Sequence, residues 1–346
     1  MTRAAKPADI APQDAVSRLD TLLPPWPGRP VVFDGAVTYL RETPATAPGA
    51  QPALYVHGLG GSSQNWTDLA GMLAHRLSGQ AIDLPGFGLS HPARSYSLAA
   101  SAQRVVNFIE YAGRGPVHLV GNSLGGAITV RVAAVRPDLV RTLTLISPAM
   151  PFLDPRRSAQ SQMLPLLVVP QAHRIAARRL ARITPADLVT QVLAECFADP
   201  SRLPEQRMAE AVREARLRYD LPWYLTAYLR TLRGLVGSFL RAYLPGSGSL
   251  WRIAARIQAP TLVIAGTEDR LVDVRVAAQV ARVVPDARLL ELPGVGHVAQ
   301  MEVPEITARA MVALLDEYAA AATPAPVPVR VRRRPVPLPR AGESVA

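Results

Sequence analysis

Short apolar runs recur along the chain, and each leads into a turn rich in glycine, proline or polar residues. Longer amphipathic stretches with helical spacing separate these runs. Buried strands that alternate with helices are typical of a parallel sheet covered on both faces. We therefore expect an α/β fold with a doubly wound, mostly parallel sheet. The predicted strands cover residues 53–56, 80–84, 117–120, 143–146, 261–265 and 289–292, and the predicted helices cover 97–112, 124–135, 273–283 and 302–320.

The alternation is interrupted once, between residues 151 and 252, by a stretch that predicts only helices. An insertion between two core strands is expected to form a helical cap over the carboxyl ends of the sheet. The Asp34-Gly35 pair lies between two further apolar runs and predicts a β-hairpin with a type I′ turn. The expected organisation is an extended N-terminal arm (1–30), a core in two parts (31–150 and 253–322), the cap (151–252) and a disordered tail rich in proline and arginine (323–346).

The composition indicates a folded chain whose excess charge lies in two segments. Hydrophobic residues make up 49% of the 346 residues, which excludes global disorder. The net charge of +11 is concentrated in residues 154–252, with a net of +7, and in the tail, with a net of +4. Arginine supplies nearly all of the positive charge, and no nucleic-acid-binding motif is present. We therefore expect a solvated basic surface and no nucleic-acid partner.

The sequence also bears on the compartment of the protein. Cys196 stands alone, so no internal disulfide framework can form, which fits a reducing compartment. Residues 1–20 mix charge with proline and hold no apolar stretch of the kind found in secretory signals. No uncharged apolar window reaches the length of about 18 residues that a bilayer span requires. We expect a cytoplasmic protein, and the sequence indicates no particular oligomeric state.

A serine lies at the junction of a predicted strand and a predicted helix. Gly121-Asn122-Ser123-Leu124-Gly125 matches the G-x-S-x-G pattern of a nucleophile elbow. In such an elbow a sharp turn lifts the serine hydroxyl clear of the sheet, and the glycines avoid collisions with the neighbouring strand and helix. Ser123 would then lie at the positive end of the helix dipole. Taken alone, the segment also fits a phosphate-binding loop or a plain strand–helix turn.

A second glycine-rich loop, residues 57–61, follows an earlier strand. Such a loop lets a backbone N–H approach the carbonyl oxygen of a substrate held on Ser123. The expected donors are the N–H groups of Leu59 and Leu124, which together would form an oxyanion hole. We expect His57 to organise this loop rather than to act as a base.

His297 and Asp269 are the candidates for the base and the acid that an activated serine requires. Each follows one of the last two predicted strands. The base needs a carboxylate that fixes its tautomer and stabilises the imidazolium. The chain order Ser123, Asp269, His297 is the one found in α/β-hydrolases and differs from the order in other serine-triad folds. Glu268 and Asp154 are weaker candidates for the acid.

Together these motifs make the chain resemble the α/β-hydrolase superfamily, in the branch that carries a cap. The resemblance covers residues of about 50–150 and 255–320. It implies a structural role for Asp83-Leu84-Pro85-Gly86-Phe87-Gly88-Leu89-Ser90, a segment that forms a loop near the active site in this family. Haloalkane dehalogenases and epoxide hydrolases of this fold use an aspartate nucleophile, whereas this elbow carries Ser123. The other motifs that carry the resemblance are 57–61, 121–126, 266–270 and Gly296-His297 followed by Glu302-Val303-Pro304-Glu305.

The resemblance implies a serine hydrolase, a carboxylesterase or lipase, that cleaves the carboxylic ester of a hydrophobic small molecule or lipid through an acyl-enzyme. That reaction needs neither a metal nor an organic cofactor, and no clustered His, Cys and Asp spacing indicates a metal site. Two alternatives stay open. A C–C bond hydrolase acting on ring-cleavage products would use the same triad, and a small-molecule receptor with slow turnover would share the fold.

The cap is expected to select the substrate. Its apolar residues favour a hydrophobic acyl or alkyl group, and Phe152, Trp223 and Tyr224 are the substrate-binding candidates. Most apolar residues of the cap are expected to pack its helices against one another. A basic stripe in the cap fits a solvated helix face or a peripheral contact with anionic lipid; it consists of Arg174, Arg178, Arg179 and Arg182.

Overall fold

A single sheet runs through the part of the chain that the computed structural model describes, residues 4–151, 183–244 and 249–322. Its nine strands lie in the order β1-β9-β8-β7-β6-β4-β5-β3-β2. The predicted α/β architecture is thereby confirmed. The strands are β1 (Lys6–Pro7), β2 (Gly28–Phe33), β3 (Ala36–Thr43), β4 (Gln51–Val56), β5 (Leu77–Ile82), β6 (Val117–Asn122), β7 (Val140–Ile146), β8 (Thr261–Gly266) and β9 (Ala287–Leu292).

The sheet is parallel except at one edge. Every neighbouring pair from β1 to β5 runs parallel, whereas β3 pairs antiparallel with both β5 and β2. Strands β6 and β8 are buried along their whole length, which explains why apolar residues predominate in them without a regular alternation with polar ones. Because carboxyl ends of parallel strands meet at one edge, the loops after β4, β6, β8 and β9 gather there.

The hairpin at the antiparallel edge has the predicted turn. Two residues, Asp34 and Gly35, separate β2 from β3, and their φ angles are 49° and 68°. Positive φ at both central positions defines a type I′ turn, whose twist matches that of the flanking strands.

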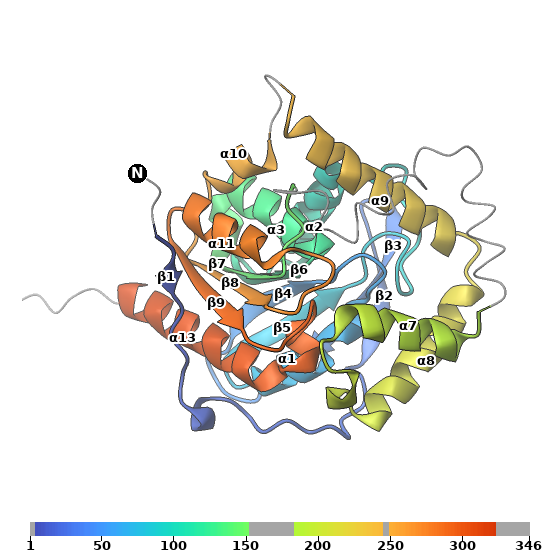
Figure 1. The fold of residues 1–346 in the computed structure, drawn as a ribbon, viewed down its shortest axis with the longest axis horizontal. Helices are drawn as coiled ribbons and strands as arrows, with labels where there is room; N and C mark the ends of the chain where they lie inside the picture. The colour runs from blue at the N-terminus through green and yellow to red at the C-terminus, as the bar shows by residue number, and fades with distance from the viewer. Residues whose placement is uncertain (1–3, 152–182, 245–248, 323–346) are drawn as a thin grey trace, which may run out of the picture.

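Helices cover both faces of the sheet (Figure 1). The apolar core is correspondingly split in two, with one cluster of buried residues on each face. The first face carries α2 (Leu98–Ala112), α3 (Leu124–Val135), α10 (Leu250–Ala254) and α11 (Val274–Val283), and the second carries α1 (Thr67–Met72), α12 (Ala299–Glu302) and α13 (Pro304–Ala322). In the described ranges, short 3₁₀ turns connect other elements: η1 (Gln13–Ala15), η2 (Ser63–Trp66), η3 (Pro137–Leu139) and η5 (Pro200–Arg202).

Among the described residues between β7 and β8, three helices precede α10, and we refer to them as the inserted helices: α7 (Pro185–Cys196), α8 (Glu205–Tyr219) and α9 (Tyr224–Arg241). Helices α7 and α8 share a small apolar cluster, to which the core contributes Val298. Helix α9 lies against the segment before α2, so closely that a Cβ on Gly234 would be 2.2 Å from the Tyr96 carbonyl oxygen.

A buried ion-pair network also fixes α8 to the core. The Arg207 guanidinium contacts Asp68 of α1 at 2.6 Å and Glu210 at 2.8 Å, and all three side chains are at most 10% exposed. Both carboxylates lie on one guanidinium, so the burial of these charges is compensated.

The structure departs from the sequence expectations mainly near the N-terminus. The arm predicted to be extended contributes β1, which adds a strand to the edge of the sheet beside β9, and β2 already begins at Gly28. The predicted helix 172–182, the basic stripe, Phe152 and the tail 323–346 lie outside the described residues.

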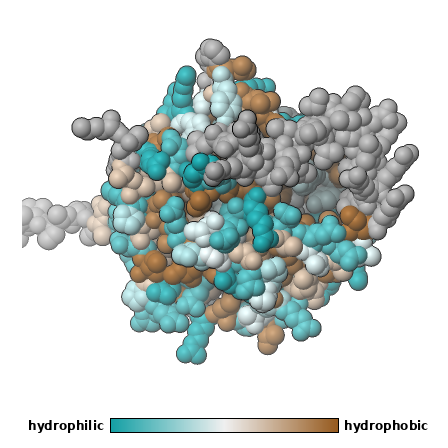
Figure 2. Space-filling view, viewed as in Figure 1, coloured by the Kyte–Doolittle hydropathy of each residue, from teal (hydrophilic) through white to brown (hydrophobic). Residues whose placement is uncertain are grey.

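The described surface is mixed in character. Figure 2 shows hydrophobic residues scattered among hydrophilic ones on the face turned to the viewer. Large apolar side chains are exposed at the end of α9 and just after it, at Leu240, Tyr243 and Leu244. No helix in the described parts of the chain has both the length and the apolar character needed to cross a bilayer.

Buried His118 of β6 makes the fold sensitive to acid. Its Nδ1 lies 2.8 Å from the Thr142 hydroxyl, and burial, aided by Arg141 and Arg76, lowers its pKa to about 4. The unfolded chain therefore binds more protons than the folded chain between pH 6.5 and 4, and stability is lost as the pH falls through this window. This one group accounts for about 3 kcal/mol of that loss by pH 4.

We therefore expect His118→Asn to flatten the fall in unfolding free energy between pH 7 and pH 4.5, measured by urea denaturation against the wild type. The other titrating groups are common to both proteins and cancel in the comparison. Equal slopes for the two proteins would contradict the lowered pKa of His118.

Candidate active site

Ser123 occupies a strained turn between β6 and α3. Its φ and ψ angles are 54° and −116°, a conformation that costs a non-glycine residue about 1–3 kcal/mol. The turn is tight because glycines flank it. A Cβ on Gly121 would lie 2.5 Å from the Gly125 carbonyl oxygen, and one on Gly125 would lie 2.1 Å from that of Val56. The G-x-S-x-G pattern therefore reflects close backbone approach on both sides of the serine.

Hydrogen bonds hold the backbone of this turn from both sides. The Ser123 N–H donates to the Ile146 carbonyl of β7 at 3.0 Å, and the Ser123 carbonyl accepts from the Ala149 N–H at 2.9 Å. Leu124 is the first residue of α3, and the first-turn N–H groups of a helix have no acceptor within the helix. Its N–H therefore lies at the positive end of the helix dipole without an acceptor in the helix.

The loop after β4 lies directly against the serine. A Cβ on Gly58 would be 3.1 Å from the Ser123 Cβ. The Gly61 N–H donates to the Gly58 carbonyl at 3.1 Å, and Gly60 has a φ of +77°. These two features describe a turn with Leu59 and Gly60 at its central positions. Leu59 is thus carried on a tight turn beside the serine, and we refer to residues 58–61 as the glycine turn.

His57 organises this turn, as predicted. Its Nδ1 donates to the Gly58 carbonyl at 2.7 Å, and its Nε2 accepts from the Leu84 N–H at 2.9 Å. The ring is fully buried, and burial lowers its pKa to about 4. Both ring nitrogens are thus engaged by backbone, and His57 is neutral at physiological pH.

Asp269 and His297 form a buried hydrogen-bonded pair. The Nδ1 of His297 lies 2.8 Å from Oδ2 of Asp269, and the side chains are 4% and 1% exposed, respectively. Oδ1 of Asp269 accepts from the N–H groups of Leu271 and Val272 at 2.8 and 2.9 Å. Burial on its own would raise the pKa of Asp269, but His297 and the Val272 N–H hold it below its ordinary value. Glu268, the weaker candidate, is exposed.

Asn122 connects the serine turn to the histidine loop. Its side-chain amide donates to the Ile146 carbonyl and to the His297 carbonyl, both at 3.1 Å. Asn122 directly precedes Ser123, so the structure brings the loops after β6 and β9 into contact. The sequence singled out Ser123 and His297 but assigned nothing to the asparagine between the glycine and the serine.

The loop after β5 has the structural role expected of it. The Asp83 carboxylate accepts from the N–H groups of Ser63 and Leu89 at 2.6 and 2.8 Å. A Cβ on Gly88 would lie only 1.9 Å from this carboxylate. Burial raises the pKa of Asp83, and these backbone donors oppose the shift. The carboxylate therefore anchors two loops at the carboxyl edge of the sheet.

This arrangement agrees with a comparison against known protein families. The family described as alpha/beta hydrolase fold matches residues 52–304, which include the serine turn, the glycine turn and the Asp269–His297 pair. The chain belongs to the α/β-hydrolase family.

Relatives of this α/β-hydrolase have different names. It is 29% identical over 274 residues to the dihydrolipoyllysine-residue acetyltransferase component of the acetoin cleaving system of Pseudomonas putida, 78% of this chain and 65% of that protein. It thus spans less than two thirds of that relative. It is 28% identical to the 2-(acetamidomethylene)succinate hydrolase of Mesorhizobium japonicum (76% of this chain, 87% of the relative) and to the monoacylglycerol lipase abhd6-B of Xenopus laevis (78% and 76%).

Solved structures show the same fold. A putative lipase from Acinetobacter baumannii superposes on the hydrolase with a TM-score of 0.70, and the match covers 86% of this chain and 93% of the other. The sequence identity in this pair is 21%, so the likeness concerns the fold.

The inserted helices of the hydrolase cover the glycine turn. A Cβ on Gly60 would lie 3.3 Å from the Tyr228 ring and 3.8 Å from the Tyr224 hydroxyl. Tyr224, a predicted substrate-binding residue, also packs edge-on against Phe87 at 6.3 Å between ring centroids. Trp223, the second candidate, lies instead against His91, with 5.6 Å between ring centroids. Phe152, the third, lies outside the described residues.

Glu302 joins the histidine loop of the hydrolase to the segment that follows α7. Its side chain is completely buried. Oε2 accepts from the N–H groups of Gly296 and Ala198 at 2.7 and 3.2 Å, and Oε1 accepts from Asp199 N–H and from Arg202, both at 3.0 Å. The sequence showed Glu302 only as part of a family pattern, because its partners other than Gly296 lie about 100 residues away.

The backbone of the histidine loop also contacts the inserted helices directly. The His297 N–H donates to the Cys196 carbonyl at 2.7 Å, and a Cβ on Gly296 would lie 2.4 Å from the same oxygen. The position of His297 therefore depends on the seating of α7 as well as on β9.

We expect Glu302→Gln to lower the unfolding free energy by about 2–4 kcal/mol, because an amide nitrogen replaces an oxygen that accepts two N–H donors. Glu305→Gln is the matched control, since Glu305 is 46% exposed and lies 3.9 Å from Arg309. Its effect should remain within about 0.5 kcal/mol. Urea denaturation at pH 7 measures both, and equal effects would show that Glu302 has no such structural role.

Proposed function

We propose that this α/β-hydrolase is a serine hydrolase that cleaves the carboxylic ester of a hydrophobic small molecule or lipid through an acyl-enzyme on Ser123. One observation carries the proposal. Ser123 lies in a strained turn at the N-terminus of α3, and Asn122 ties that turn to the loop whose His297 is hydrogen-bonded to buried Asp269. A nucleophile, a base and an orienting acid are the groups that acyl transfer requires.

In the first half of the reaction His297 accepts the hydroxyl proton as Ser123 Oγ attacks the ester carbonyl. Asp269 holds the Nδ1–H and thereby presents Nε2 as the base, and its lowered pKa keeps it ionised to stabilise the imidazolium. The tetrahedral intermediate then collapses, and His297 donates the proton to the leaving alcohol. The acyl group remains on Ser123 as an ester.

The developing oxyanion would be bound by the N–H groups of Leu59 and Leu124. Leu124 begins α3, and Leu59 lies on the glycine turn that contacts Ser123. Both donors are backbone groups fixed before the substrate arrives, so little reorganisation is needed when charge develops. In the second half, His297 activates a water molecule that attacks the acyl-enzyme, and Ser123 is released with the acid product.

The apolar character of the proposed substrate is supported by the residues over the glycine turn and by one relative. Tyr224 and Tyr228 place aromatic side chains against this turn, and buried Phe87 supports Tyr224 from behind. The relative from Xenopus laevis is named as a monoacylglycerol lipase, and a monoacylglycerol is an ester that carries an acyl group. We therefore favour an ester with an extended apolar acyl or alkyl group.

A panel of 4-nitrophenyl esters, from acetate to palmitate, tests the reaction. We expect hydrolysis that depends on acyl length and falls by about 10⁴-fold or more in Ser123→Ala. Ser101→Ala, a substitution on α2, is the matched control and should retain full activity. A fluorophosphonate should label the wild type once, at Ser123, as read by mass spectrometry of the intact protein and its peptides.

Two outcomes would overturn the proposal in different ways. Labelling of Ser123 without ester turnover would indicate that the same residues act on another bond or in a receptor. The absence of labelling would mean that Ser123 is not an activated nucleophile.

The assignment of the acid can be tested separately at two neighbouring residues. We expect Asp269→Asn to lower kcat by about 10³- to 10⁴-fold with little change in KM, because the amide no longer fixes the imidazole tautomer. Glu268→Gln removes the same charge from an exposed neighbour and should leave kcat within about twofold. A larger loss in Glu268→Gln than in Asp269→Asn would reverse the assignment.

A further inference from the structure

A single arginine of the inserted helices reaches the glycine turn. The Arg218 guanidinium lies in the last turn of α8, donates through Nη1 to the Gly60 carbonyl at 2.6 Å and donates through Nη2 to the Glu214 carboxylate at 2.6 Å. The two side chains are 15% and 17% exposed. The hydrogen bond to Gly60 connects residues 158 positions apart in the chain.

The Gly60 carbonyl belongs to the peptide unit that closes the glycine turn. The N–H of that unit, from Gly61, donates to the Gly58 carbonyl at 3.1 Å, and its C=O accepts from Arg218. The closing peptide is therefore held at both ends. Leu59 lies inside this closed turn, so the direction of its N–H depends on the peptide that Arg218 holds.

The turn has little intrinsic stiffness of its own. Three of its four residues are glycines, and Gly60 has a φ of +77°, which only glycine adopts readily. A flexible backbone lowers catalysis if a donor must be ordered during the reaction, whereas a preorganised donor does not incur that cost. An external hydrogen bond from a charged donor supplies the missing restraint.

The arginine is itself held in place. Glu214 lies one helical turn before Arg218 and forms an ion pair with it. A hydrogen bond from the Ser62 side chain also lowers the pKa of Glu214. Burial alone would raise the pKa of Glu214 and lower that of Arg218, but the pairing reverses both shifts. Both groups therefore stay charged. The guanidinium carbon of Arg218 lies 5.9 Å from the ring centroid of Tyr224, whose hydroxyl lies near Gly60 of the glycine turn.

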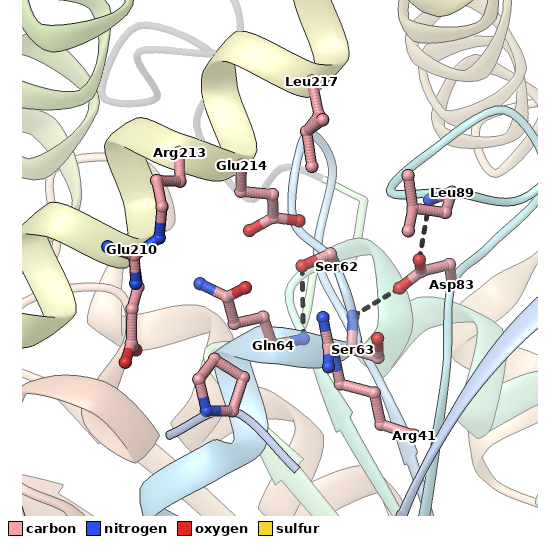
Figure 3. A pocket seen from close by; sticks show the side chains of 11 residues that line it. Arg41, Ser62, Ser63, Gln64, Asp83, Leu89, Glu210, Arg213, Glu214 and Leu217 are labelled. Carbon is pink, nitrogen blue, oxygen red and sulfur yellow. Dashed lines mark hydrogen bonds between the residues drawn. The ribbon is translucent and has the colours of Figure 1, made fainter. Parts of the chain in front are cut away.

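Small molecules can reach the glutamate end of this pair through a cavity. Figure 3 shows Glu214 projecting from α8 into this cavity, opposite Ser62 and Asp83. The cavity has a volume of about 190 Å³ and lies between α8 and the loops that follow β4 and β5. A small cation in this space would meet the Glu214 carboxylate.

We propose that Arg218 is a positioning residue for the oxyanion hole. From a helix outside the catalytic core, Arg218 fixes the glycine turn and hence the direction of the Leu59 N–H. This inference rests on the proposed function, because it assigns Leu59 to the oxyanion hole of an ester hydrolase. Seating of α8 on the core and activity of the serine site are then coupled through one guanidinium.

The test compares Arg218→Ala with Arg216→Ala, which removes the same charge from an exposed position on the same helix. We expect Arg218→Ala to lower kcat for the best 4-nitrophenyl ester by about 10- to 100-fold, less than the loss of a whole oxyanion donor. KM should change by less than about threefold, because ground-state binding does not use the oxyanion donors. Arg216→Ala should keep wild-type kinetics.

Guanidinium at millimolar concentrations, far below denaturing levels, provides a second readout. It should restore at least about tenfold of the lost kcat in Arg218→Ala by binding Glu214 and the Gly60 carbonyl, and should leave the wild type and Arg216→Ala unchanged. A role limited to packing α8 against the core would give no rescue in a folded variant. Arg218→Lys keeps the charge and should lower kcat by at least about fivefold, because a single ammonium group does not reproduce the planar fork.

The outcomes separate this inference from the proposed function. If the wild type hydrolyses the esters while folded Arg218→Ala retains its kcat, or loses activity only through KM, the inference is wrong and the proposed function stands. A folded Arg218→Ala that guanidinium does not rescue also overturns it. If Arg218→Ala does not fold, wild-type kcat in Arg218→Lys overturns the inference. If the wild type shows no ester hydrolysis, the proposed function is wrong, and the inference falls with it because it rests on that function.

Discussion

The site depends on how closely the start of α3 approaches the end of β4. Gly125 is so near Val56 that a single added carbon would lie 2.1 Å from the Val56 carbonyl oxygen. This approach forces the sharp turn at Ser123 and directs the first N–H groups of α3 toward the loop that begins at His57. One backbone contact thus fixes the positions of the strained serine, the N-terminus of α3 and the neighbouring glycine turn relative to one another.

The core alone does not fix the geometry of the site, because two of its loops are held in place by hydrogen bonds to the inserted helices and the segment after α7. The histidine loop is tied to the end of α7 through the His297–Cys196 backbone bond and through Glu302. The glycine turn is tied to α8 through Arg218. Each connection includes a charged group with several partners, Glu302 fully buried and Arg218 only 15% exposed, and the removal of one partner from such a group is costly. The inserted helices therefore contribute to the geometry of the site as well as covering it.

The sequence predicted the sheet, the hairpin turn and the residues gathered at the carboxyl edge because each has a local signature. Apolar runs, glycine spacing and the Asp-Gly pair are read over a few residues. The short strand β1 has no such signature, since two residues paired with β9 show no periodicity. The structural roles of Arg218 and Glu302 were missed for a related reason, because each role depends on a partner that lies about 100 or more residues away. Within the sequence Arg218 is indistinguishable from exposed Arg216, and only the packing of α8 separates them.

His57 and His297 both lie at the carboxyl edge of the sheet, and their surroundings differ in whether they suit the role of a base that is proposed for His297. Both ring nitrogens of His57 are hydrogen-bonded to backbone groups: Nδ1 donates to the Gly58 carbonyl and Nε2 accepts from the Leu84 N–H. Burial lowers the pKa of this ring to about 4. Such a ring has no nitrogen with which to accept a proton from a substrate or a serine. His297 instead gives Nδ1 to a carboxylate whose lowered pKa keeps it charged, so the imidazolium would form beside a compensating anion. A base that must gain and release a proton in each cycle requires the second environment, because the first would oppose every protonation.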